Sequence, residues 1–310
     1  MSTINQTVLR IETCPESHRG AALWLATGGA ASRMSPGRVA ALLAAEKSGK
    51  ISFDGLLVAR RGERIVAAVW IQRQAGNLGT CWGPGRITAE SPEICTELLE
   101  IGVRWAATQG CRIIQSILEV APTPIEEDLS HANFRPLAEL EYLSGLAERF
   151  PTGPPSGRIG LVAYRPEFRE QLEKIIQATY RESLDCPELD DLRSIDDVLA
   201  GYRAAGDLGE AGWYFVRHER QIVGCLILAY HQEINQAELV YCGLTPTARG
   251  LGLGVELTRE ALWWANERGA DQLVLAVDRR NTPAIQTYVR SGLLTTDHKR
   301  LWVRVIDDAR

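Results

Sequence analysis

The clearest alternation of apolar and polar positions lies in the second half of the chain. Residues 239–244 form an apolar run that predicts a buried strand, which Thr245 and Pro246 end because proline has no N–H for a sheet ladder. A helical period then covers residues 255–269, and residues 273–277 predict the next strand. A strand, turn, helix and strand in this order predict an α/β fold.

The same pattern occurs in the first half of the chain. At a constant shift of 159 residues, five positions of the two central helices carry identical residues: Glu97, Leu98, Trp105, Ala106 and Gly110 fall on Glu256, Leu257, Trp264, Ala265 and Gly269. A stretch rich in proline and glycine, residues 150–157, separates the halves and is typical of a linker. We therefore predict two copies of one fold, in domains 1–150 and 158–310.

A glycine-rich turn opens the helix at 255–269. Glycines in such a turn allow close backbone approach, and the free N–H groups with the helix dipole favour a phosphate or pyrophosphate. A Walker loop is excluded because Val255 stands where its lysine should be, and a dinucleotide fingerprint because residues 273–275 are apolar where it needs an acid. The pattern Arg-x-x-Gly-x-Gly remains, met by Arg249, Gly252 and Gly254.

This turn resembles the pyrophosphate loop of the GNAT superfamily of acyl-coenzyme A-dependent N-acyltransferases. The helix at 281–293, with Asn281, Tyr288 and Gly292, is also similar to that family's pattern, although Leu293 replaces the usual Phe. The match covers about residues 158–306. It implies two tandem folds, each a mixed, mostly antiparallel twisted sheet flanked by helices, and transfer of an acetyl group from acetyl-CoA directly to a primary amine. Tandem copies with one degenerate half resemble the mycothiol synthase-type acyltransferases, a comparison that implies architecture and not the thiol-sugar substrate.

The resemblance also implies roles for individual residues. Tyr288 is expected near the coenzyme sulfur, where a hydrogen bond to the leaving thiolate is favoured over proton donation because a phenol is a weaker acid than a thiol. Glu238 is the candidate base for the amine, although it could instead face solvent or pair with an arginine. Asn281 binds the coenzyme, caps its helix, or does both. The remaining coenzyme-binding residues are the strand amides of Cys242, Gly243 and Leu244 and the turn Arg249, Gly250, Leu251, Gly252, Leu253 and Gly254.

The first copy lacks these groups. At the same shift, Glu90, Glu93 and Cys95 replace Arg249, Gly252 and Gly254, and a carboxylate repels a phosphate. Gly79 replaces Glu238, and Leu129 replaces Tyr288. We expect the first domain to be structural or to contribute to the acceptor side.

The composition of the chain argues against several classes of binding partner. A net charge of −5 without a basic run argues against nucleic acid, and no apolar run is long enough for a membrane span. Seven scattered cysteines and five histidines show no metal spacing and indicate a reduced, cytoplasmic setting without a metal cofactor.

The acceptor and the oligomeric state stay open. Residues 182–197 carry seven acids against Arg193, which suits either a cationic acceptor or a solvated loop and helix start. The alternatives to an acetyltransferase are a non-catalytic acyl-CoA-binding regulator and a tandem transferase with another donor, such as aminoacyl-tRNA.

Overall fold

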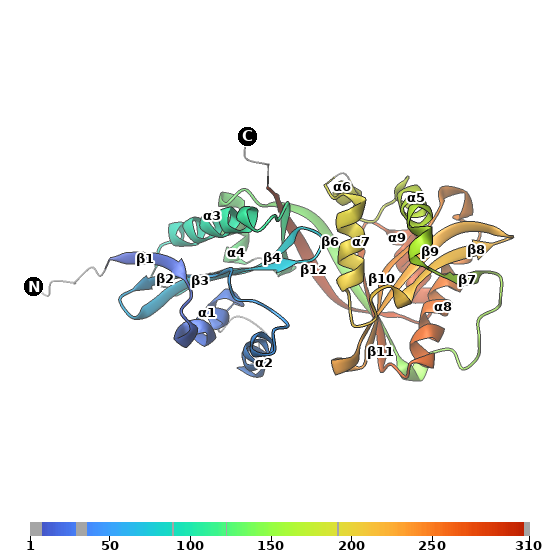
Figure 1. The fold of residues 1–310 in the computed structure, drawn as a ribbon, viewed down its shortest axis with the longest axis horizontal. Helices are drawn as coiled ribbons and strands as arrows, with labels where there is room; N and C mark the ends of the chain where they lie inside the picture. Colours follow the sequence, from blue (N-terminus) through green and yellow to red (C-terminus); the bar gives the residue numbers. More distant parts are fainter. Residues whose placement is uncertain (1–7, 29–35, 89, 122, 191, 307–310) are drawn as a thin grey trace, which may run out of the picture. The chain divides into compact units, whose positions relative to one another are not determined.

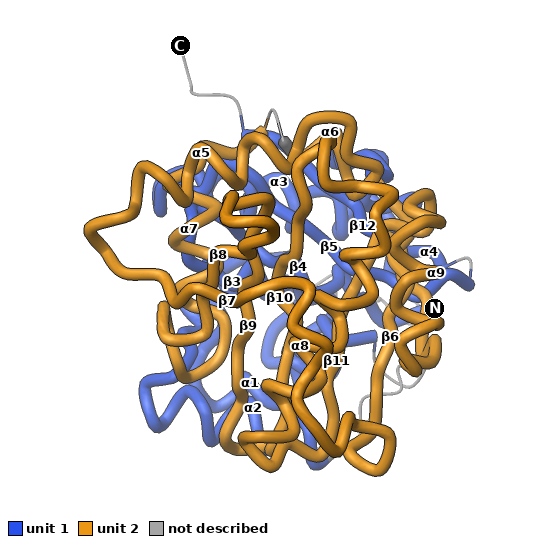
Figure 2. Tube along the Cα trace, turned by 90° about the vertical axis from the view of Figure 1, so that its right-hand side faces the viewer, with its two compact units in different colours: residues 1–137, 301–310 blue, residues 138–300 orange. Residues whose placement is uncertain are grey.

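The computed structural model describes residues 8–306, apart from 29–35, 89, 122 and 191. The chain divides into two compact units, coloured separately in Figure 2. Unit 1 comprises residues 1–137 and 301–310, and unit 2 comprises residues 138–300.

Unit 1 is a sheet covered by helices on both faces (Figure 1). Its elements in chain order are β1 (Leu9–Thr13), α1 (Arg19–Ala26), α2 (Pro36–Lys47), β2 (Leu56–Arg61), β3 (Arg64–Gln74), β4 (Leu78–Arg86), α3 (Glu93–Thr108), β5 (Ile113–Glu119) and α4 (Pro124–His131). The strand order is β1-β2-β3-β4-β5, antiparallel except for the parallel pair β4–β5. One apolar core packs α3 and α4 on the sheet, and a second packs α1 and α2 on the other face.

Unit 2 repeats this element order. Its elements are β7 (Gly160–Ala163), α5 (Arg169–Tyr180), the short α6 (Pro187–Asp190), α7 (Ile195–Ala204), β8 (Trp213–His218), β9 (Gln221–His231), β10 (Gln236–Leu244), α8 (Leu253–Glu267), β11 (Gln272–Asp278), α9 (Thr282–Arg290) and the start of β12 (Leu294–Val305). The neighbouring strands β7 to β10 are antiparallel, and β10–β11 is parallel. The predicted fold class, two copies of a mixed and mostly antiparallel sheet flanked by helices, is confirmed.

Two helical layers position the site in unit 2. Leu257, Ala261 and Leu262 of α8 pack on one face of the sheet, with Tyr288 of α9 in the same core. Leu172 and Ile176 of α5 pack with α7 on the opposite face. The end of β10, from which the chain continues into α8, therefore lies between these two helical layers.

The compact units do not follow the linear division at residues 150–158. The strand β6 (Arg135–Leu146) leaves unit 1 at residue 137, and its residues 140–146 pair with β11 of unit 2. The last strand, β12, returns at residue 301 and contributes its end to unit 1, where Ile306 N–H donates to the Arg112 carbonyl. Each unit is thus completed by a strand from the far side of the linker.

A short 3₁₀ turn at Pro166–Phe168 precedes α5, and the α-helix follows from Arg169. Proline suits this first turn because the N–H that it lacks would have no helical partner there.

Candidate active site

The strand β10 separates from its parallel neighbour halfway along its length. It pairs with β11 only through residues 236–238, while its pairing with β9 continues to Leu244. A register shift between Leu239 and Tyr241 marks a β-bulge, which bends the strand at that point. The backbone of residues 239–244 on the side of β11 therefore borders a space between diverging strands.

The turn after β10 holds its backbone in a conformation that favours glycine. Gly250 and Gly252 both have φ near +76°, in the left-handed region that a side chain resists. Gly252 is the N-cap of α8, and no side chain caps that helix. The first N–H groups of α8 lack intrahelical partners, so they form with the dipole a positive end suited to an anion.

The sequence motif predicts Arg249 as a coenzyme-binding residue, but its side chain binds backbone carbonyls of the protein. Its guanidinium donates to the carbonyl of Leu244 and to the carbonyls of Thr179, Arg181 and Glu182, at 2.7–3.0 Å. Three of these carbonyls belong to the end of α5 and the residues after it, where a cation complements the negative end of the helix dipole. Arg249 therefore ties the glycine turn to α5, and the amides of the turn are left to face an anion.

A cavity of about 480 Å³ lies between these elements. It is lined by the end of β10, the start of α8, α9, the end of β11 and the segment after α5. All of the predicted site residues line it except Leu251 and Glu238. Close packing at its walls favours glycine at two positions: a Cβ on Gly243 would lie 2.7 Å from Thr179, which excludes a side chain there, and one on Gly254 would lie 3.2 Å from Thr287, a tight contact.

Tyr288 and Cys242 face each other across the cavity wall. The Tyr288 hydroxyl lies 3.3 Å from the Cys242 sulfur. Burial raises the pKa of Tyr288 well above its usual value, so the phenol stays protonated and can donate a hydrogen bond. Burial also raises the pKa of the Cys242 thiol to about 11, against a smaller lowering effect of the bond with Tyr288. Cys242 is then a thiol at neutral pH, which makes it a poor nucleophile.

Asn281 serves as a helix cap and also lines the cavity. Its Oδ1 accepts the N–H of Ala284 at 3.3 Å, at the start of α9. The same residue borders the space between β11 and α8. The structure thus shows the capping role, and the position is compatible with a second role toward a ligand.

Glu238 lies on β10 before the bulge, paired with a histidine. His231 Nε2 and Glu238 Oε2 are 2.7 Å apart, from neighbouring antiparallel strands. The Glu238 side chain is about 36% exposed, so solvent can reach it. The expected alternatives for this residue were a base, a solvent-facing position or an arginine partner, and the structure shows a histidine partner.

Two acids of the segment 182–197, Glu188 and Asp196, form ion pairs within the fold. Glu188 forms a bidentate pair with Arg280, which also holds the buried Asp278. Asp196 pairs with Arg169, and Ser194 caps α7 by accepting the Asp197 N–H. Asp191 lies outside the described residues, and only the backbone of Asp190 is described. Asp185 differs from these acids because it lines the cavity.

At this site Arg158 is not predicted from the sequence, whereas Asp185 belongs to the acidic segment 182–197 that the sequence suggests for a cationic acceptor. Arg158 donates to the Leu251 carbonyl at 3.1 Å, which places a cation beside the glycine turn. Asp185 faces the cavity from the loop after α5. The Arg158 contact joins residues distant in sequence, so no local pattern indicates it.

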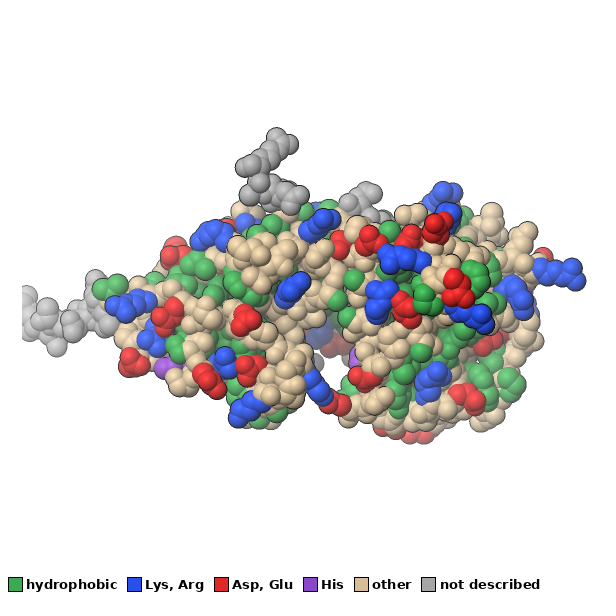
Figure 3. Space-filling view, viewed as in Figure 1, with side chains coloured by type: hydrophobic (Ala, Val, Ile, Leu, Met, Phe, Trp, Pro, Cys, Tyr) green, Lys and Arg blue, Asp and Glu red, His purple; other side chains and the backbone are tan. Residues whose placement is uncertain are grey.

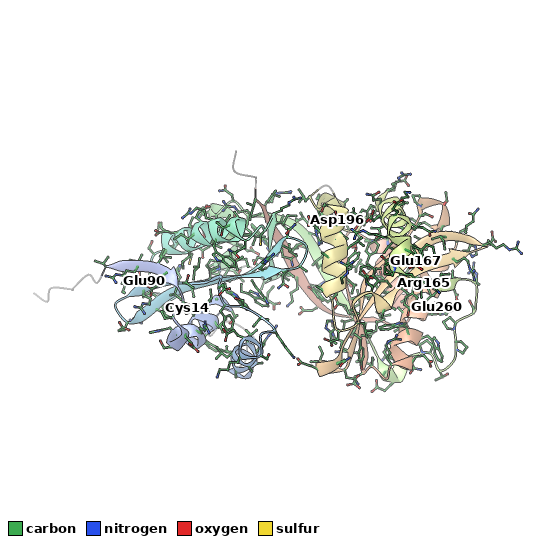
Figure 4. All side chains as sticks on the ribbon, viewed as in Figure 1. Cys14, Glu90, Arg165, Glu167, Asp196 and Glu260 are labelled. Atoms are coloured by element: carbon green, nitrogen blue, oxygen red, sulfur yellow. The ribbon has the colours of Figure 1, made fainter. Side chains whose placement is uncertain are left out.

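The corresponding turn of unit 1 is occupied by a carboxylate. Glu90, labelled in Figure 4, precedes α3 and pairs with Arg61 at 2.9 Å. The first helical turn of α3 begins after Pro92, which has no N–H, and Leu129 is fully buried. An anion would meet negative charge there instead of free amides.

The surface shows mixed charge. On the face seen in Figure 3, Lys and Arg side chains are interspersed with Asp and Glu. Among the described helices, none has the length and apolar character to cross a bilayer. The described His, Cys, Asp and Glu side chains form no group of three that could hold a metal ion.

Comparison with known proteins finds a family profile that matches most of the second half of the chain. The profile of the acetyltransferase (GNAT) family matches residues 155–293. Over 170 residues the chain is 30% identical to a mycothiol acetyltransferase of Salinispora tropica, covering 53% of each chain. The matched stretches span from 20% to 53% of the length of the curated relatives.

Solved structures share the fold over nearly the whole chain. A GCN5-related N-acetyltransferase from Sphaerobacter thermophilus superposes with a TM-score of 0.67 at 14% identity, covering 97% of both chains. A tandem GNAT protein from the clavulanic acid biosynthesis pathway superposes with a TM-score of 0.52 at 13% identity, covering 98% of this chain and 100% of that protein.

Proposed function

From the premise that residues 155–293 form a domain of the acetyltransferase (GNAT) family, we propose that the protein transfers an acetyl group from acetyl-CoA to a primary amine. The observation that carries this proposal is the cavity at the diverging ends of β10 and β11, with the uncapped start of α8 on its wall. A diphosphate fits the amides of residues 250–254, and a pantetheine arm fits the free strand edge at residues 242–244.

The donor carbonyl would meet backbone amides at the bulged end of β10. Donors fixed by the strand and the bulge need no reorganisation when charge develops on the thioester oxygen. The amine nitrogen then attacks the carbonyl carbon, the C–S bond breaks, and the coenzyme leaves as a thiolate. Tyr288, protonated and inside the cavity, is the donor for that thiolate.

The amine must lose a proton for this attack. A lysine-like ammonium has a pKa of about 10.4, so removal at neutral pH needs a base. We propose Glu238 for this role, acting through a water because its side chain is not part of the cavity wall. His231 holds the carboxylate by the 2.7 Å contact.

Unit 1 would then have a supporting role. The Glu90–Arg61 pair stands before α3, where unit 2 has its glycine turn, and Leu129 is buried in the apolar core. These features support one coenzyme site per chain, in unit 2. The names of the curated relatives suggest an amine on a small molecule as acceptor, a class that we adopt here without its particular member.

The test is a binding measurement followed by an activity screen. Acetyl-CoA at a hundredfold excess over its dissociation constant should stabilise the protein by about 2.7 kcal/mol, which a thermal melt detects. A screen of polyamines, amino sugars, lysine peptides and aminoglycosides should then show release of free CoA with one class. Replacing Glu238 by Gln should lower kcat about 10²-fold and leave acetyl-CoA binding unchanged. Binding without turnover of any amine would instead identify an acyl-CoA-binding regulator.

A further inference from the structure

Asp185 lines the cavity together with Arg249 and Arg290, and none of the described cations forms an ion pair with its carboxylate. Glu182 and Asp185 are the acidic residues on the described cavity wall, and Glu182 is exposed to solvent. In the described part of the chain, no Lys, Arg or His forms an ion pair with Asp185. Its Oδ1 accepts the backbone N–H of Asp278 at 2.8 Å.

The loop around Asp185 is fixed to the end of β11. Ser183 Oγ accepts the Asp185 N–H at 3.1 Å, and the next residue, Cys186, donates its N–H to Asp278 Oδ2 at 3.2 Å. The Asp278 carboxylate is fully buried and is neutralised by Arg280. The position of Asp185 is therefore set by backbone contacts, while its charge is left without a partner.

This arrangement is unfavourable for the protein alone. Burial raises the pKa of Asp185; the Asp278 N–H opposes that shift, and the Asp278 charge adds to it. A desolvated charge without a counter-ion is rare in proteins and, inside a cleft, is typical of a functional site.

The other acids of the same segment differ from Asp185. Arg280 holds Glu188. Arg169 of α5 holds Asp196, which lies at the start of α7. Neither lines the cavity. Asp185 also acts on the reacting region, since its negative charge adds to the burial that raises the pKa of Tyr288 and of Cys242.

We propose that Asp185 binds the ammonium group of the acceptor and places it at the end of the cavity that holds Cys242 and Tyr288. This inference rests on the proposed acetyl transfer and adds the class of acceptor. The acceptor binds as a cation, and a carboxylate next to its amine is repelled by Asp185 and Glu182. Diamines, amino sugars and amino-acid amides fit this site, and free α-amino acids do not.

The first experiment compares Asp185→Asn with Asp196→Asn in the full chain. Asn at 185 can still accept the Asp278 N–H, so the loop keeps its contact, and Asp196 is an exposed acid of the same segment (Figure 4). The probes are 1,4-diaminobutane, glucosamine, lysine amide and lysine, used with acetyl-CoA. For the best of these amines, Asp185→Asn should raise KM about 10- to 100-fold, the range for one lost charge-assisted contact, with Kd for acetyl-CoA unchanged. Asp196→Asn should leave both constants unchanged.

A second measurement separates charge recognition from a structural effect. The hydroxyl analogue of the best amine, added as a competitive inhibitor, should bind the wild type more weakly than the amine does. In Asp185→Asn this preference should disappear.

The outcomes are distinct. An unchanged KM, or a preference for the amine that survives in Asp185→Asn, overturns the role of Asp185 while acetyl transfer stands. A wild type that binds acetyl-CoA but acetylates none of the probes overturns the proposed acceptor class, and failure to bind acetyl-CoA overturns the proposed function as well.

Discussion

At the scale of single residues, the burial of Tyr288 determines the protonation state of its hydroxyl. Its hydroxyl lies 3.3 Å from the Cys242 sulfur, and burial keeps it protonated. A phenol in this state can donate to a developing thiolate but cannot act as a base at neutral pH. The proposed role is therefore that of a fixed donor, as the sequence pattern around Asn281 and Tyr288 predicts.

We expect Tyr288→Phe to lower kcat about 10²-fold, in the range found for removing one donor to a developing anion. The Kd for acetyl-CoA should change little because the ring and its packing remain. Pre-steady-state and steady-state release of CoA, measured with an excess of acceptor, check this expectation. A variant with full kcat would show that the thiolate leaves without help from this hydroxyl.

Asp185 leads to a prediction on stability and pH. Its folded-state pKa is raised above the unfolded value of about 3.9, so its charge opposes folding at neutral pH. That unfavourable contribution is complete above the folded pKa and disappears as the pH falls below the unfolded value. Asp185→Asn should therefore have a higher Tm than the wild type at pH 7, with a difference that shrinks towards pH 4.

Thermal melts between pH 4 and pH 8 measure this difference directly. Asp196→Asn is the matched control, because it removes a surface ion pair with Arg169 and should leave Tm equal or lower at pH 7. A Tm for Asp185→Asn below that of the wild type at pH 7 would contradict the reading of Asp185 as an unpaired charge.

The sequence predicts the residues of the site better than the direction of their side chains. Gly250, Gly252 and Tyr288 lie where the pattern places them, since their roles follow from local backbone and helix positions. Arg249 and Asp185 depend on partners 67–93 residues away, which a motif does not contain. The resemblance predicts which residues gather, and the long-range contacts decide which atoms face the cavity.

At the scale of elements, Arg249 joins three segments. Its guanidinium binds carbonyls at the end of β10 and at the end of α5, while its backbone begins the glycine turn. The segment that carries Asp185 follows directly after α5. Arg249 therefore ties the glycine turn to the start of the segment that carries Asp185.

Arg249→Gln should destabilise the fold by about 2 to 3 kcal/mol, because four carbonyls, two of them in half-buried contacts, lose charged donors. For a domain of this size, that lowers Tm by about 4 to 12 °C. The affinity for acetyl-CoA should fall in the same variant, since the turn loses its anchor. Thermal melts with and without acetyl-CoA measure both effects.

Arg165→Gln is the control for that experiment. Arg165 and Glu167, labelled in Figure 4, are exposed and 3.8 Å apart before α5, so the change should stay within about 0.5 kcal/mol. Equal effects of the two substitutions would contradict an anchoring role for Arg249.

At the scale of the whole molecule, the sequence shows that the fold is doubled. It does not show that β6 and β12 each run from one unit into the other. The shift of 159 residues locates equivalent helices, because helix faces repeat their pattern locally. The partners of β6 and β12, in contrast, are set by tertiary packing far along the chain. The linker at 150–157 is therefore a boundary in the sequence and not between the compact units.

Because β6 and β12 run from one unit into the other, the end points of a fragment decide whether it can fold. A fragment of residues 151–310 lacks β6, which pairs with β11 from Leu140 to Leu146 and supplies Leu143 to the apolar core. The bare edge of β11 and the incomplete core predict an insoluble or unfolded product. A fragment of residues 138–300 contains every strand pair of unit 2 and should be more soluble, with a cooperative melt that acetyl-CoA shifts upward. Folding and full acetyl-CoA affinity in the 151–310 fragment would show that the strand from the first half is dispensable, and the linear division of the chain would then describe its folding units.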